Sequence, residues 1–100
     1  MTPLSSKQRA HLRGLAHALK PTVHIGKDGV TESALRGLWE TLGTHELVKV
    51  RVLEAAPQSA KETAQALAQA TDEAHVVQVV GRNVTLYRAD PDEPEIRLPR

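Results

Sequence analysis

Residues 23–31 read VHIGKDGVT, and this stretch decides the fold. Three residues suited to a β-strand, Val23 to Ile25, are followed by a Gly-x-x-Gly turn at 26–29. Thr31 is a favourable N-cap, so a helix is expected to begin directly after it. A strand, a glycine turn and a helix in this order predict one unit of an α/β fold.

Upstream of this stretch, apolar residues recur at the spacing of one helix face. We expect a helix that begins at Ser5 or Ser6 and ends near Leu19, because Pro21 cannot continue it. Its predicted buried stripe consists of Leu12, Leu15, Ala16 and Leu19. A second stripe, about 100° around the helix, is basic and should border the buried face; it consists of Arg9, Arg13, His17 and Lys20.

Downstream, a second helix is expected from Thr31 to about Thr44, with a buried stripe of Leu35, Leu38, Trp39 and Leu42. The stretch 47–53 alternates as a strand does: Val48, Val50 and Val52 point one way and Leu47, Lys49, Arg51 and Leu53 the other. One face is apolar and the other mixed, which predicts helices on one side of the sheet only.

The remaining elements are a third helix and two strands. Ser59 and Glu62 form a capping box for a helix to about Ala70. Strands at 76–80 and 84–87 are joined by a glycine-containing hairpin connection at 81–83. The predicted order is α-β-α-β-α-β-β, a two-layer α/β (α+β) fold in a single domain, residues 1–100. Residues 89–100 read as an extended acidic C-terminal tail whose Ile96 and Leu98 could dock on the body.

Composition excludes several classes of protein. The chain has 100 residues and no cysteine, which rules out disulfides, thiol nucleophiles and cysteine-ligated metals. Trp39 and Tyr87 are its only aromatic residues, too few for a sheet that stacks RNA bases in the usual way. No apolar run is long enough for a membrane span, and the start does not resemble a signal peptide. We expect a soluble, cytoplasmic protein.

The charge is unevenly distributed along the chain. Residues 1–29 carry five Lys or Arg against one acid, whereas residues 89–100 carry two against four. This asymmetry suggests a polyanionic partner for the front of the chain. The alternative interpretation is an ordinary solvated helix face.

The Gly-x-x-Gly turn has features of a phosphate site. Glycines allow the backbone to approach a ligand, and a helix N-terminus favours anions. Lys27 adds a cation, while Asp28 works against anion binding unless it caps a turn. If the first helix packs near the turn, its basic stripe and Lys27 form one patch; otherwise the motif is an ordinary strand-to-helix turn. We expect Gly29→Val to spare the fold and abolish ligand binding.

The residue pattern does not indicate a metal site, a cofactor site or a catalytic site. The five histidines lack the spacing of a metal site, so no metal is expected. The turn lacks the ending of a P-loop and there is no dinucleotide fingerprint, so no cofactor is expected. No spacing suggests a nucleophile with its base, and we expect no catalysis.

Seven blocks of the sequence resemble the CRM family (chloroplast RNA splicing and ribosome maturation), in particular its bacterial single-domain YhbY-type members. The resemblance covers about residues 4–100. The blocks are 4–9, 15–21, 24–31, 45–50, 77–82, 86–88 and 96–100.

The resemblance implies a mixed four-stranded sheet in the order 1-2-4-3 with an antiparallel fourth strand, as in the C-terminal domain of translation initiation factor three. It implies a non-catalytic RNA-binding protein that acts on ribosomal RNA in precursors of the large ribosomal subunit and assists ribosome assembly. We separately expect a monomer that does not bind membranes. The family's loop falls on Gly26, Lys27, Asp28 and Gly29, and its basic surface on Arg9, Arg13, His17 and Lys20.

Two alternatives remain open. The chain could be an adaptor that docks on ribosomal proteins through the open sheet face, or a small-molecule or enzyme domain with a deep polar pocket. Lys49 and Arg51 on that face could form a second RNA surface, although a solvated face is the favoured interpretation.

Overall fold

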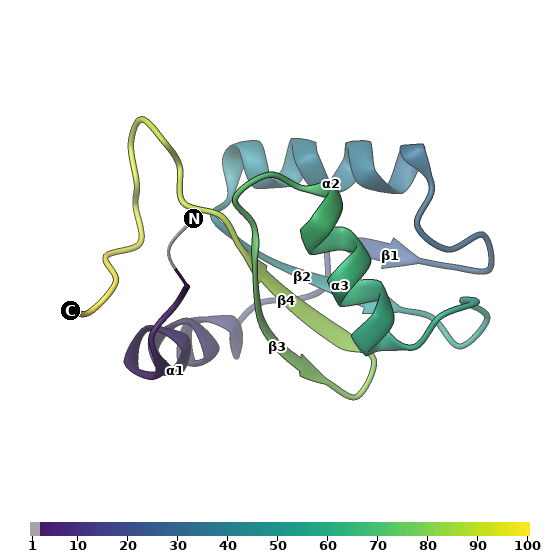
Figure 1. Ribbon diagram of the computed structural model, residues 1–100, viewed down its shortest axis with the longest axis horizontal. Coiled ribbons are helices and arrows are strands. Elements are labelled where there is room, and N and C mark those ends of the chain that lie inside the picture. Colours follow the sequence, from purple (N-terminus) through teal and green to yellow (C-terminus); the bar gives the residue numbers. More distant parts are fainter. Residues whose placement is uncertain (1–2) are drawn as a thin grey trace.

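The computed structural model describes residues 3–100, in which three helices and four strands alternate (Figure 1). The elements are α1 (Ser6–Ala16), β1 (Val23–Ile25), α2 (Glu32–Thr44), β2 (Leu47–Val52), α3 (Ala60–Ala70), β3 (His75–Val80) and β4 (Asn83–Tyr87). This order confirms the predicted fold class. None of the helices within residues 3–100 combines the length and the apolar character that crossing a bilayer requires.

Each helix begins at a side chain that caps it. The hydroxyl oxygens of the three N-caps accept hydrogen bonds of 3.1 Å from the third backbone N–H of their helix: Ser5 from Gln8, Thr31 from Ala34 and Ser59 from Glu62. These hydroxyls satisfy donors that would otherwise lack an intrahelical partner. The predicted starts of the helices are confirmed, but α1 ends at Ala16, earlier than predicted.

The four strands form one mixed sheet in the order β1-β2-β4-β3. β1 runs parallel to β2, while β4 is antiparallel to both of its neighbours. This is the strand order that the family resemblance implied. A β-bulge between Val76 and Gln78 shifts the register of β3 against β4.

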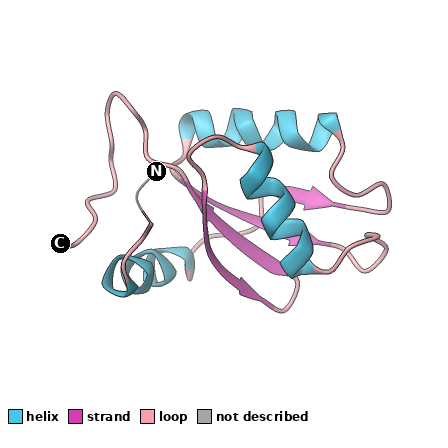
Figure 2. Cartoon of the chain, viewed as in Figure 1, coloured by secondary structure: helices cyan, strands magenta, loops and turns pink. Residues whose placement is uncertain are grey.

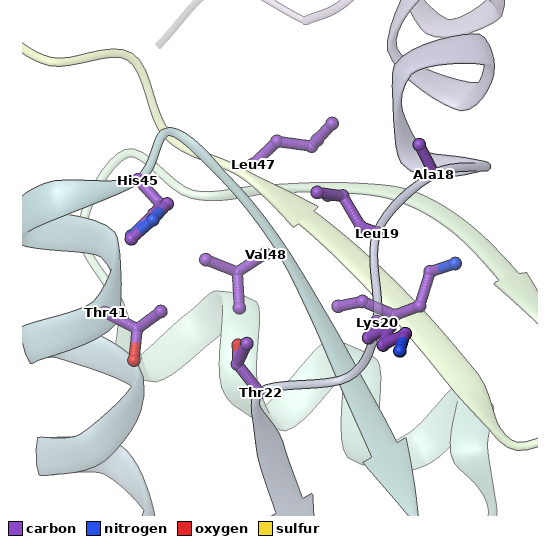
Figure 3. Close-up of a pocket in the computed structure, with 9 residues that line it drawn as sticks. Ala18, Leu19, Lys20, Thr22, Thr41, His45, Leu47 and Val48 are labelled. Atoms are coloured by element: carbon purple, nitrogen blue, oxygen red, sulfur yellow. The ribbon is translucent and has the colours of Figure 1, made fainter.

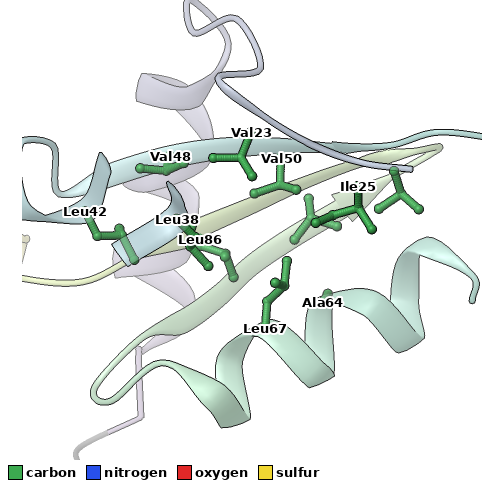
Figure 4. Packing of buried hydrophobic residues seen from close by; sticks show 11 residues of the cluster. Val23, Ile25, Leu38, Leu42, Val48, Val50, Ala64, Leu67 and Leu86 are labelled. Atoms are coloured by element: carbon green, nitrogen blue, oxygen red, sulfur yellow. The ribbon is translucent and has the colours of Figure 1, made fainter. Parts of the chain in front are cut away.

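One face of the sheet is covered by α2 and α3, as Figure 2 shows. The valines of β2 at 48, 50 and 52 point to this face and are almost fully buried. They pack against Leu38 and Leu42 of α2 and Leu67 of α3 (Figure 4). Burial of each such side chain contributes about 1.5–3 kcal/mol, so this cluster is the main source of stability.

The opposite face is covered in part by α1, so the prediction that helices lie on one side only is wrong. Leu12 and Ala16 of α1 are fully buried against Leu47, Val77 and Tyr87, which lie on three different strands. These three residues form an apolar patch at one end of a face that is otherwise polar. The helix covers this patch and leaves the rest of the face open.

Two predicted core residues are exposed. Trp39 has 48% of its surface exposed and Leu15 has 42%. Trp39 lies at the edge of the buried stripe of α2, where the guanidinium carbon of Arg88 lies 4.7 Å from the centre of its ring. The ring therefore contributes a cation–π contact at the surface instead of packing in the core.

The C-terminal tail is docked on the body. Ile96 and Leu98 pack against the cluster beneath α1, as the sequence suggested. The buried carboxylate of Glu46 accepts hydrogen bonds of 2.7 Å from the backbone N–H groups of Asp90, Glu95 and Ile96. The tail therefore lies at the α1 end of the molecule, away from the β1–α2 turn (Figure 1).

Candidate functional site

The Gly-x-x-Gly turn closes tightly at the end of β1. The N–H of Gly29 donates to the carbonyl of Gly26 over 3.0 Å, and Gly29 has a φ of 70°. A Cβ on Gly29 would lie 3.0 Å from Cγ of Pro57, whereas one on Gly26 would meet only Leu53 Cδ1 at 3.9 Å. The backbone and the packing at Gly29 thus both disfavour a side chain, which argues against the expectation that Gly29→Val spares the fold. Gly26 leaves the backbone open to approach.

A polar hollow of about 380 Å³ lies over the turn and the start of α2. Its lining includes the backbone of the turn, the exposed Lys27 and Asp28, and the side chains of His24 and Ser33. The N-cap hydroxyl of Thr31 accepts a hydrogen bond from the N–H of Ala34. The amides that precede Ala34 at the start of α2 have no intrahelical partner. The hollow therefore combines a cation, amide donors and a helix N-terminus, although Asp28 and Glu32 add negative charge.

Among the basic residues predicted on the first helix, Arg9 uses its side chain to hold the helix to the sheet. Its guanidinium donates to the carbonyl oxygens of Val76 and Val77, at 2.6 and 3.3 Å. These bonds anchor α1 to the beginning of β3. Arg13 and His17, on the next turns, are exposed.

The helix and the turn do not pack against each other, contrary to the sequence-based expectation. α1 packs at the Leu47 end of β2, while the turn follows Ile25, which pairs with Val52 at the other end. Five residues of strand separate these ends, about 17 Å. Figure 1 shows α1 and the β1–α2 turn at opposite ends of the molecule.

The open half of the sheet lies between α1 and the β1–α2 turn. In register, His24 of β1 lies opposite Arg51, Arg51 opposite Asn83 of β4, and Asn83 opposite Val80 of β3. The next row holds Lys49, Thr85 and Gln78. Because side chains alternate between the two faces, both rows lie on the face that α1 covers in part. Neither row contains an acid.

Basic side chains lie in neighbouring positions from the end of α1 to the turn. His17 and Lys49 line one hollow, and His24 and Lys27 line another. Arg51 stands between them, two residues from Lys49 along β2 and opposite His24. We call the following residues the cationic band: Arg13, His17, Lys20, His24, Lys27, Lys49 and Arg51.

Lys20 joins the band from the segment between α1 and β1. It lines a small, mainly apolar hollow of about 220 Å³ together with Lys49, Leu19 and His45 (Figure 3). Sequence reasoning placed Lys20 on the helix, whereas it lies beyond the end of α1. The favoured interpretation of Lys49 and Arg51 from the sequence was a solvated face. Their alternation with the valines of β2 was the signal that both lie on the open face of the sheet.

Three titratable groups near α1 and the C-terminal tail have shifted pKa values. Burial, together with the charge of Arg9, lowers the pKa of His75. Burial, together with Glu46, raises the pKa of Tyr87. Hydrogen bonds from the backbone of Asp92 and Glu93 lower the pKa of Asp90. Within residues 3–100, no group of three or more His, Asp or Glu side chains is arranged to hold a metal ion.

Comparison with known proteins assigns the chain to a family. Residues 4–88 match the CRS1 / YhbY (CRM) domain. The chain belongs to the CRM family.

Relatives of this CRM domain match it over nearly its whole length. A Haemophilus influenzae protein named RNA-binding protein is 41% identical over 100 residues, 100% of this chain and 99% of the relative. A Bacillus subtilis protein named probable RNA-binding protein YqeI is 33% identical over 96 residues, 96% of this chain and 99% of the relative.

A solved structure shows the same fold. The solution structure of a hypothetical Staphylococcus aureus protein, described as a candidate RNA-binding protein, superposes with a TM-score of 0.82 at 39% sequence identity. The match covers 97% of this CRM domain and 100% of that chain.

Proposed function

We propose that this CRM domain is a non-catalytic RNA-binding protein that holds single-stranded ribosomal RNA along the cationic band and assists assembly of the large ribosomal subunit. The alignment of basic side chains from the end of α1 across β2 and β1 to the turn is the observation that carries the proposal. RNA binding is also the property named for its relatives. The ribosomal target follows from the family resemblance.

The shape of the band suits a strand better than a compact anion. The band crosses the sheet from the end of α1 to the turn after β1, and neighbouring strands lie about 4.8 Å apart. Cations spread at such intervals can each contact a different phosphate of one RNA chain. Gly26 adds a stretch of backbone that a phosphate can approach closely.

Salt dependence tests this function on the purified protein. Five full positive charges lie in the band: Arg13, Lys20, Lys27, Lys49 and Arg51. Five contacts to single-stranded RNA give a log–log salt slope near −3.5, so a fourfold rise in salt should weaken binding about 100-fold. Filter binding to a fragment of large-subunit ribosomal RNA measures this slope. Absence of binding at low salt would overturn the proposal.

The adaptor alternative uses the same open sheet face but needs a different surface chemistry. That face carries Lys49, Arg51 and His24, and among its strand residues, all within 3–100, Val80 is the one strongly exposed apolar side chain. A polar, cationic face favours a polyanion over an apolar protein partner. Nuclease treatment of precursor particles distinguishes the two, because it should release an RNA-bound protein and leave an adaptor in place.

A further inference from the structure

A pocket opens in the sheet beside the C-terminal end of α1. It has a volume of about 270 Å³ and is lined by His17, Lys49, Gln78, Val80, Asn83 and Thr85. We call it the sheet pocket. Thr85 of the central strand β4 is buried between Lys49 on β2 and Gln78 on β3, with which it is in register.

The β-bulge in β3 gives the pocket its polar wall. Without a bulge, consecutive residues of a strand point to opposite faces. Here Val77 packs in the cluster beneath α1, and Gln78 pairs with Thr85, a residue of the same face. The bulge therefore supplies an apolar contact for the helix and, one residue later, an amide for the pocket.

The polar groups of the pocket are chemically complementary to one edge of a nucleobase. Lys49 offers only hydrogen-bond donors. Asn83 offers an acceptor, since its buried Oδ1 receives no hydrogen bond from any residue in 3–100. An unpaired buried acceptor is unfavourable, so a rotation of the amide that turned Oδ1 toward a ligand N–H in the pocket would gain stability. Gln78 supplies both a donor and an acceptor.

We propose that the sheet pocket binds one keto nucleobase, guanine or uracil, of an RNA strand lying on the cationic band. The proposal deepens the proposed function and rests on it. Guanine and uracil present a carbonyl oxygen beside a ring N–H, which match the Lys49 ammonium and the Asn83 acceptor. Adenine and cytosine present an amino group in place of this carbonyl. An amino group and the Lys49 ammonium are both donors, so they cannot hydrogen-bond to each other.

The surroundings of the pocket fit the rest of a nucleotide. Arg51 lies beside Asn83 in register, and His17 lies at the edge of the pocket on the α1 side. Arg51 would meet a phosphate on one side of the bound base with positive charge, and the His17 imidazole could hydrogen-bond to one on the other side. The chain thus combines a sequence-independent grip with one position that reads a base.

Oligouridine and oligocytidine of equal length test the pocket directly, because the two bases differ in the keto and amino groups that the pocket distinguishes. Fluorescence anisotropy should show that the wild-type protein binds oligouridine at least about fivefold more tightly. Gln78→Ala and Asn83→Ala should reduce this ratio toward one with no change in salt slope. Lys49→Gln should reduce the ratio and also lower the slope by about 0.7.

Gln65→Ala on the exposed face of α3 is the matched control and should keep the ratio of the wild type. Lys49→Gln keeps the test decisive if Asn83→Ala, at the start of β4, fails to fold. Equal binding of the two oligonucleotides by the wild type would overturn the pocket and leave the proposed function standing, as would a ratio that survives Lys49→Gln. Failure to bind either oligonucleotide would overturn the proposed function itself.

Discussion

His24 on β1 lies directly opposite Arg51 on β2, so the strand that leads into the glycine turn and the strand that begins beneath α1 present basic side chains next to each other. Through this pair, the cations at the two ends of the molecule form one band. We therefore expect RNA to contact the sheet as much as the turn.

Removal of a band cation that does not line the sheet pocket should weaken RNA binding for all sequences alike. Arg51→Ala and Lys27→Ala should each lower the salt slope by about 0.7, because each removes one phosphate contact. Both side chains are exposed, so the free energy of unfolding should change by less than about 0.5 kcal/mol. Lys61→Ala is the matched control, since Lys61 is exposed on α3, on the opposite side of the sheet. An unchanged slope for Arg51→Ala would remove the sheet from the binding surface.

Arg9 and Arg13 should behave differently although they lie one turn apart. Arg9→Ala removes charged hydrogen bonds to two backbone carbonyls and should lower the free energy of unfolding by about 2 kcal/mol in urea denaturation. Arg13→Ala should leave stability unchanged and lower the salt slope. Equal effects of the two substitutions on stability would contradict the anchoring role of Arg9.

The two glycines of the turn should also differ. Gly29→Ala places a side chain in the left-handed region and against Pro57, so the free energy of unfolding should fall by at least about 1–2 kcal/mol. Gly26→Ala meets no atom closer than 3.9 Å and should leave stability unchanged, while it narrows the backbone approach and weakens RNA binding. Thermal unfolding together with filter binding separates the two effects. A stable Gly29→Ala protein would show that the strain is absent.

Glu46 should control whether the tail stays docked. Glu46→Ala leaves the N–H groups of Asp90, Glu95 and Ile96 without their shared acceptor and should cost about 2 kcal/mol. Hydrogen exchange at those three amides should accelerate at least about tenfold. The exposed Glu40 on α2 provides the control substitution, Glu40→Ala. Slow exchange in the Glu46→Ala protein would mean that apolar contacts alone hold the tail.

Local features of the fold could be predicted from the sequence. The capping side chains Ser5, Thr31 and Ser59 act within one turn of helix, so each was found without knowledge of the tertiary structure. The alternation of β2 likewise identified Val48 and Val50 as core.

Non-local features could not be predicted. The apolar stripe of α1 shows that one side is buried, but the patch it covers is assembled from Leu47, Val77 and Tyr87, which are far apart in the sequence. The bulge that turns Gln78 to the same face as Val77 also depends on strand pairing. For the same reason the sequence identified the cations but placed them beside the turn instead of across the sheet.

The most direct test of the cationic band is a map of RNA contacts from backbone amide chemical shifts during titration with oligouridine. The account predicts shifts at residues 13–20, 24–29 and 49–51, which hold the cationic band, and at 78–85, which line the sheet pocket, and none along α3. Shifts confined to α2 and α3, with those strands unaffected, would contradict it.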